Sequence, residues 1–323
     1  MSRPLRVAAS LAITGLCAFY IAWQIDIGKA AHELAKANYG YFLAAVAIML
    51  GSVAPMAWRW QRLLEARGIH DRLPWLMRAY LVSYTAGQVL PTSLGGDASR
   101  IFEATRRHPG NGAAAAGSVL LERALGGAAT MLLAGAGFLL AVGHYDVGGY
   151  LWVELAFVIV SIAAAVGLFA RGARPLLRFA VPVLRPLRLE RPIRAAYEGI
   201  HGYRDHAPLL ASMFALTVVV QAVRVLAIWL TGKAVGVDLS PRPYYVMGPL
   251  LFLVALVPFT VNGLAVREAF FVSFLGQLAV NKSVAFDTGF LFFLVTIALS
   301  LPGLAILARE GLRGARRHAE SSA

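Results

Sequence analysis

Apolar residues gather along the chain in long blocks that short polar joints separate. The blocks fall at about residues 7–25, 40–57, 79–94, 113–142, 150–170, 208–231, 244–259, 269–280 and 288–308. Several of them have about 20 residues, which is the length of a helix that crosses the hydrocarbon core of a bilayer. The pattern therefore predicts an all-α integral membrane protein with a single transmembrane domain over residues 1–323.

Composition agrees with this prediction. The 323 residues are 59% hydrophobic and only 15% charged, whereas soluble domains carry about 25% charged residues. The net charge of +13 would suggest nucleic acid in a soluble protein, but membrane proteins collect Lys and Arg in cytoplasmic loops. Basic patches interleaved with aromatic residues, which bind single strands, are not evident. We therefore expect no nucleic-acid partner.

Arginine and lysine are concentrated in some of the joints, two of which are consecutive. The basic joints are residues 1–6, 58–78, 97–108 and 171–207. The tail from residue 309 is also basic, and its last part, 313–323, is expected to be a cytoplasmic tail. Basic joints face the cytoplasm, so both termini are expected inside a bacterial-type inner membrane. Because joints 58–78 and 97–108 share one side, block 79–94 must enter and leave by the same face. The same reasoning makes 244–280 a hairpin from the opposite face.

The sequence thus predicts about six full spans and two oppositely oriented re-entrant helical hairpins. The hairpin tips are related, since Leu90–Arg100 and Val257–Arg267 share Pro, Gly, Ala and Arg at a constant offset. This pattern indicates an inverted-topology repeat with halves at about 1–145 and 146–312. In transporters such repeats place the substrate site near the midplane, where broken helices meet.

Arg100 and Arg267 each follow a tip and begin a half-helix. A helix N-terminus attracts anions, and a guanidinium offers a planar fork for phosphate. Alternatively, Arg100 pairs with Asp97 one turn earlier or extends to the interface. The candidate headgroup site comprises Gly95, Gly96, Asp97, Arg100, Asn262, Gly263, Arg267 and Glu268.

Three further charges, Glu122, Arg123 and Arg224, fall inside apolar blocks. Such charges face a cavity or pair with one another. A bridge between Glu122 and Arg224, or between Glu268 and Arg123, would satisfy this requirement, either for transport or only to hold the bundle. Asp97 and Glu268 could carry a coupling proton or could be simple N-terminal carboxylates of helices.

Three motifs connect these residues with a known family: the turn Pro91–Asp97, the pair Glu122-Arg123 and the turn Asn262–Glu268. By these motifs the chain resembles the lysylphosphatidylglycerol synthase transmembrane-region family, whose members are also called flippase-like. Thr92, Ser93 and Ala265 stand where the family usually has Gly. We expect a stand-alone translocating unit without the aminoacyltransferase domain that the bifunctional members of this family carry.

The expected function is translocation of an anionic lipid between leaflets, with an anionic phospholipid, a polyprenyl-phosphate or an isoprenoid lipid as partner. The seven histidines lie in joints or the tail without a zinc-site spacing, and Cys17 is the only cysteine. We therefore expect no catalysis, metal or cofactor. The alternative is a non-catalytic scaffold of a lipid-modification or glycolipid synthesis complex. A partner lipid-modifying enzyme or a homo-oligomer is compatible with both readings.

Overall fold

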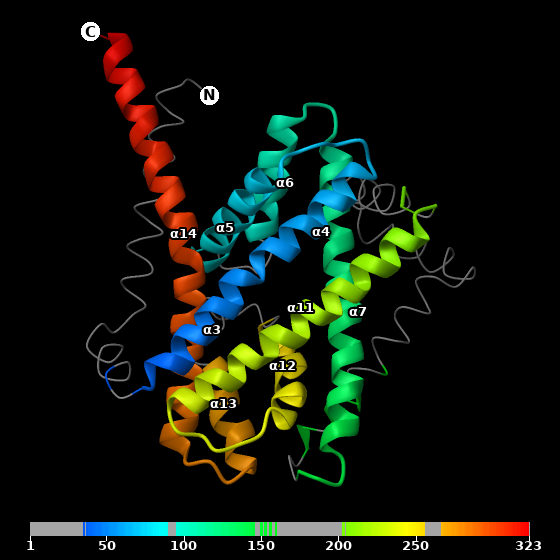
Figure 1. Ribbon diagram of the computed structural model, residues 1–323, viewed down its shortest axis with the longest axis vertical. Coiled ribbons are helices and arrows are strands. Elements are labelled where there is room, and N and C mark those ends of the chain that lie inside the picture. Colours follow the sequence, from blue (N-terminus) through cyan, green and yellow to red (C-terminus); the bar gives the residue numbers. More distant parts are fainter. Residues whose placement is uncertain are drawn as a thin grey trace, which may run out of the picture.

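A computed structural model describes residues 37–89, 95–145, 205–255 and 266–322, with a few further residues at 35, 149–150, 152–153, 155–156, 159 and 202–203. Every regular element in this part of the chain is an α-helix. The helices are α3 (Tyr39–Gly51), α4 (Val53–Glu65), α5 (Leu73–Val89), α6 (Gly95–Arg107), α7 (Gly112–Ala141), α11 (Ala207–Ala234), α12 (Arg242–Ala255), α13 (Val266–Gln277) and α14 (Lys282–Ser322) (Figure 1).

Within the described residues, four segments are long and apolar enough to cross a membrane. They are Tyr39–Glu65, which joins α3 to α4, Gly112–Ala141, Ala207–Ala234 and Lys282–Leu312. The prediction of an all-α membrane protein is thus confirmed. Two other predicted spans, at 7–25 and 150–170, fall wholly or mostly outside the described residues.

The segment Tyr39–Glu65 shows that the predicted polar joint at 58–78 begins too early. Helix α4 continues to Glu65, because apolar residues on one of its faces, among them Ala57, Trp60 and Leu64, pack into the core. Arg59 lies within this helix and is only 5% exposed. It is therefore a buried residue of the bundle and not part of a cytoplasmic loop.

Helices α5 and α6 form a helical hairpin whose open ends meet. Asp71, just before α5, accepts a hydrogen bond from Arg107 Nε at 2.6 Å, and its other oxygen lies 2.7 Å from His108 Nε2. Arg107 and His108 stand at the end of α6. The two helices have 17 and 13 residues, fewer than the roughly 20 needed to cross a bilayer.

Helices α12 and α13 form a second pair of short helices, with 14 and 12 residues. Tyr244 near the start of α12 and Leu275 near the end of α13 belong to one hydrophobic cluster, which Leu239 and Val280 extend. The beginning of α12 and the end of α13 are therefore close together. The two tips, at 90–94 and 256–265, lie outside the described residues.

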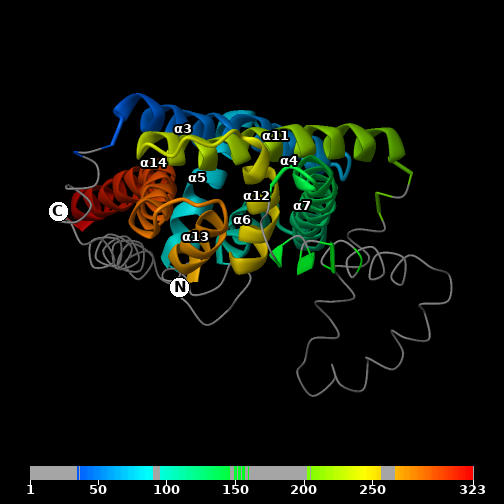
Figure 2. The same cartoon turned by 90° about the horizontal axis from the view of Figure 1, so that it is seen from below.

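The two pairs lie toward opposite ends of the molecule, with α5 and α6 near one end and α12 and α13 near the other (Figure 1). Helices α3, α4 and α11 form a layer over one face, and the remaining helices lie beneath it (Figure 2). Within the layer the start of α3 is attached to the end of α11, because Asn38 N donates to Ala234 O at 2.8 Å.

Glycines let each pair pack closely on a long helix from the other end of the sequence. A methyl group at Gly303 of α14 would lie 2.1 Å from the carbonyl oxygen of Leu81 in α5. A methyl group at Gly137 of α7 would likewise lie 2.4 Å from the carbonyl oxygen of Tyr245 in α12. Because such distances are far below van der Waals contact, only Gly fits at either place. The first helix of each pair is thus held against the long helix that follows the other pair.

Candidate functional site

A cavity of about 560 Å³ lies where α3, α4, α5, α6, α7, α11, α12 and α14 meet. Apolar residues form much of its wall, including Leu133, Val220 and Phe292. The polar side chains that line it are Arg59, Tyr80, Ser83, Tyr84, Gln88, Asp97, Arg100, Glu122, Arg123, Thr130, Thr217, Gln221, Arg224 and Thr296. Its size is typical of small-molecule sites, which are mostly apolar with a few placed polar groups.

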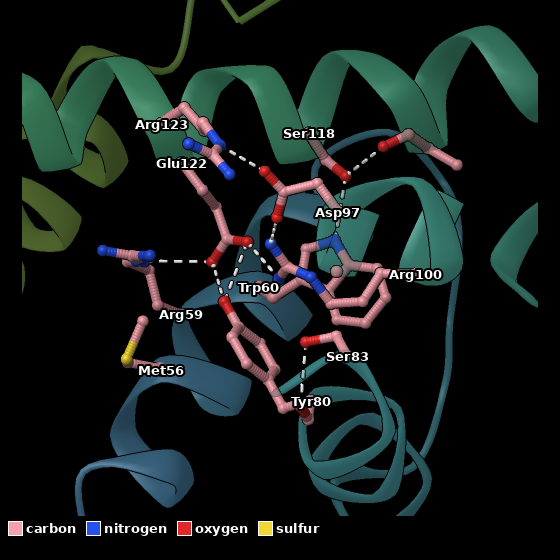
Figure 3. A network of polar contacts seen from close by, with 12 residues as sticks. Met56, Arg59, Trp60, Tyr80, Ser83, Asp97, Arg100, Ser118, Glu122 and Arg123 are labelled. Carbon is pink, nitrogen blue, oxygen red and sulfur yellow. Dashed lines mark hydrogen bonds and ion pairs between the residues drawn. The ribbon is translucent and has the colours of Figure 1, made fainter. Parts of the chain in front are cut away.

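Glu122 of α7 organises the polar wall (Figure 3). Its carboxylate accepts hydrogen bonds from Arg59 Nε at 3.0 Å and from Arg100 Nη1 at 2.6 Å. The hydroxyl of Tyr80 lies 2.7 and 2.9 Å from the two carboxylate oxygens. One buried acid therefore connects α4, α5 and α6 to α7. An ionised carboxylate so deeply buried needs several such donors to offset its lost hydration.

Asp97, in the first turn of α6, is the second acid of the wall. It accepts a hydrogen bond from Arg100 Nη2 at 2.7 Å and another from Arg123 Nε. The α6 start can approach α5 closely because residue 96 is Gly, where a methyl group would lie 2.5 Å from Ser83 O. Because of this close approach, Asp97 reaches the cavity. Gly96 therefore contributes to the site by letting the backbone of α6 lie close to α5.

Arg100 is fixed from several sides. Both Nη atoms are paired with carboxylates, and the guanidinium lies over the rings of Tyr80 and Trp60, with centroid distances of 4.2 and 5.0 Å. The Trp60 indole is itself fixed by a hydrogen bond to Ser118 Oγ at 3.0 Å. From the sequence, pairing with Asp97 was an alternative to a place in the candidate site. In the structure Arg100 both pairs with Asp97 and lines the cavity.

Sequence reasoning missed Arg59, whose Nη1 also donates to Thr217 of α11 at 2.6 Å. The signal that could have found it is the helical spacing of Ala57, Trp60 and Leu64. This spacing continues the helix past the apparent end of the apolar block. Tyr80 was also missed, since a tyrosine in an apolar block carries no distinguishing pattern.

Arg224 of α11 has unusual neighbours for a cation. Its Nε and Nη1 lie 3.4 and 3.6 Å from the sulfur atoms of Met49 and Met56, and its guanidinium is 5.9 Å from the Tyr84 ring. No carboxylate pairs with it among the described residues. The expected Glu122–Arg224 bridge was therefore wrong, because Arg59 and Arg100 occupy the Glu122 carboxylate.

The chain matches the lysylphosphatidylglycerol synthase TM region family over residues 7–303. It belongs to this family. The resemblance noted in the turns and the Glu122-Arg123 pair is thereby confirmed, and the chain is a membrane protein of a family associated with lipid modification. A search of curated proteins gives no match.

The two family turns differ in their relation to the cavity. Asp97 and Arg100 line it, but Arg267 and Glu268 do not. Instead, Arg267 Nη2 donates to Glu268 Oε1 at 2.7 Å, and its guanidinium lies over Phe293 with a centroid distance of 4.9 Å. Both residues of this second pair are buried, at 6% and 5% exposure. Asn262 and Gly263 of the late turn lie outside the described residues.

The cavity wall carries a surplus of positive charge. Arg59, Arg100 and Arg123 share the two carboxylates of Asp97 and Glu122, and Arg224 adds a fourth cation. Four cations against two anions leave two positive charges among the described residues of the wall. Uncompensated charge away from water is costly, so the cavity favours an anionic occupant. In the described part of this family member, no group of three His, Cys, Asp or Glu side chains could hold a metal ion.

Proposed function

We propose that this family member translocates an anionic lipid between the two leaflets of the membrane. The observation that carries the proposal is the central cavity with four arginines and two carboxylates in its wall. A lipid headgroup crossing hydrocarbon pays a large desolvation cost, and fixed cations lower that barrier because they replace hydration. The acyl chains need no such path and remain in the bilayer.

The route requires access from both leaflets, and the arrangement of the short helices supplies the elements for it. The Asp71 contacts at the open end of the α5–α6 pair support entry and exit of this pair by one face. The α12–α13 pair lies toward the other end (Figure 1). On this proposal both pairs are re-entrant hairpins within a bundle of about six spans, with both termini in the cytoplasm.

The two glycine contacts support an inverted repeat. The backbone of α5 packs against Gly303, and the backbone of α12 packs against Gly137 in the same way. If residues 1–145 and 146–312 are the two halves, the hairpin of each half packs against the last span of the other half. Relative rocking of the halves would then open the cavity to one leaflet at a time.

In this scheme Arg100 and Arg267 serve opposite faces. Arg100 stands in the cavity wall near Gly95 and Gly96, and Arg267 follows Asn262 and Gly263 in the later turn. The headgroup passes from one arginine to the other as the halves move. Because bidentate binding of phosphate needs a planar fork, Arg267→Lys should slow transport and Arg267→Gln should slow it further.

The experiment is leaflet-resolved labelling of headgroups in proteoliposomes that contain the full chain at known density. We expect anionic lipids to exchange between leaflets faster than in empty liposomes and in liposomes with an unrelated polytopic protein. Exchange at the background rate for every anionic lipid would refute the proposal. The same preparation tests the absence of catalysis, because mass spectrometry should detect no modified lipid after incubation with aminoacyl-tRNA or nucleotide sugar.

A further inference from the structure

We infer that the lipid carried in the central cavity bears two negative charges on phosphate oxygens, as a phosphate monoester or a diphosphate diester does, and that Arg224 contacts them. The inference rests on the proposed function and specifies its substrate class. It follows from the charges of the cavity wall and from the partners that each charge has.

The first step is the balance of charge. The linked group of Arg59, Arg100, Arg123, Asp97 and Glu122 has three cations and two anions, and Arg224 lines the same cavity. A headgroup with two negative charges neutralises the surplus of two. A phosphodiester with one charge leaves one cation uncompensated, and such a residue is costly away from water.

The second step concerns the carboxylates. Glu122 is occupied by Arg59, Arg100 and Tyr80, and Asp97 by Arg100 and Arg123. Each oxygen of the two acids already accepts a hydrogen bond from a guanidinium. A lysyl ester of phosphatidylglycerol carries two ammonium groups and one phosphate, so it would raise the surplus from two to three. The described wall therefore disfavours an aminoacylated lipid.

The third step concerns Arg224. Thioether sulfur is a weak acceptor, so the contacts with Met49 and Met56 satisfy the guanidinium poorly. It remains a donor fork on the wall of the cavity that the group around Glu122 also lines. Phosphate oxygens are stronger acceptors for such a fork and accept two parallel hydrogen bonds from it. Methionine is flexible, so the two side chains can withdraw when the phosphate arrives.

The test compares lipids of matched chain length against the full protein in nanodiscs. The probes are phosphatidate, a polyprenyl diphosphate with a sugar on its outer phosphate, phosphatidylglycerol and lysylphosphatidylglycerol, measured at about pH 8, where a phosphate monoester is almost fully dianionic. Phosphatidate or the diphosphate should bind at least about tenfold more tightly than phosphatidylglycerol, because a second charge within about 4 Å of a guanidinium is strongly attracted. Whichever of the two binds more tightly identifies the source.

Two variants assign the effect to Arg224. Arg224→Met should lower the affinity for the dianionic lipid by at least about tenfold, because one hydrogen-bonded charge contact is lost. It should lower the affinity for phosphatidylglycerol less. Lys233→Met removes a cation from the same helix at an exposed site, where Nζ bonds Asp238, and should change neither affinity. If Arg224→Met fails to fold, the comparison of lipids on the unaltered protein decides.

The outcomes separate the two proposals. Equal affinity for phosphatidate, the diphosphate and phosphatidylglycerol, or tighter binding of the lysyl lipid, overturns the dianion inference while transport remains. An unchanged preference in a folded Arg224→Met protein removes Arg224 from the site. Failure of every lipid to cross the bilayer faster than in control liposomes refutes translocation itself, whatever the binding order.

Discussion

Glu122 Oε2 lies 2.6 Å from Arg100 Nη1, and the side chains of the two residues are only 2% and 5% exposed. The pair connects α6, which follows the first tip, with α7, one of the four long apolar helices. Arg59 joins the same carboxylate from a third helix. The stability of this part of the bundle therefore depends on a single acid.

Glu122→Gln should be strongly destabilising. The change keeps the shape of the side chain but leaves Arg59 and Arg100 without their shared anion, and breaking a buried pair in this way costs about 3–5 kcal/mol. Unfolding of the purified protein in detergent measures the loss. The matched control is Glu65→Gln, which removes an acid from an exposed pair with Arg62 and should cost about 1 kcal/mol or less. Equal losses in the two variants would contradict the assignment.

Gly303→Ala should separate α5 from α14. The added methyl group would meet the Leu81 carbonyl and Thr85 Oγ1 at 2.1 and 2.4 Å, and overpacking of this kind typically costs about 1–3 kcal/mol or more. Gly135→Ala is the control, since nothing lies within 4 Å of its added methyl group. Lower thermal stability is expected for the first variant alone. A Gly303→Ala protein as stable as the control would show that the close approach is absent.

Arg78 and Glu310 join α5 to α14 a second time. Arg78 Nε and Nη2 donate to the two oxygens of Glu310 at 2.7 and 2.6 Å, and Nη1 donates to Glu103 at 2.8 Å. These side chains are partly exposed, so the lost pair in Arg78→Glu should lower the free energy of unfolding by about 1 kcal/mol. Repulsion between the new glutamate and the two acids should lower it further.

The charge swap Arg78→Glu with Glu310→Arg should recover part of this stability. A melting curve for each single variant and for the double variant gives the coupling between the two residues. Additive losses would show that the pair contributes nothing.

Cysteine labelling tests the first hairpin. His70 and Gly110 are exposed residues on either side of the α5–α6 pair, and the Asp71 contacts hold these two connections together. In right-side-out and inverted vesicles, His70→Cys and Gly110→Cys should react with an impermeant reagent from the same face. The prediction fails if the two positions react from opposite faces, and the inverted repeat then fails with it.

Much of the architecture was visible in the sequence, because long apolar blocks determine where membrane helices lie. The blocks at 113–142 and 208–231 differ from α7 and α11 by only a few residues at each end. The importance of Glu122 was also visible, since an acid in an apolar block requires a partner. The partner itself was not, because pairing across helices depends on the depth and rotation of each helix. Arg59 was missed for a different reason, because it stands near Arg62 in a segment that resembles a basic loop.

The shared carboxylate of Glu122 also constrains how the chain is made. Arg59 and Arg100 leave the ribosome before Glu122 does, so each arginine reaches the membrane region ahead of its counter-charge. An isolated arginine at the centre of a bilayer is costly to insert. We therefore expect α4 and α6 to stay near the aqueous boundary during synthesis and to reach their final depth only once α7 has emerged. Insertion of the first half of the protein is then a concerted event and not a helix-by-helix one.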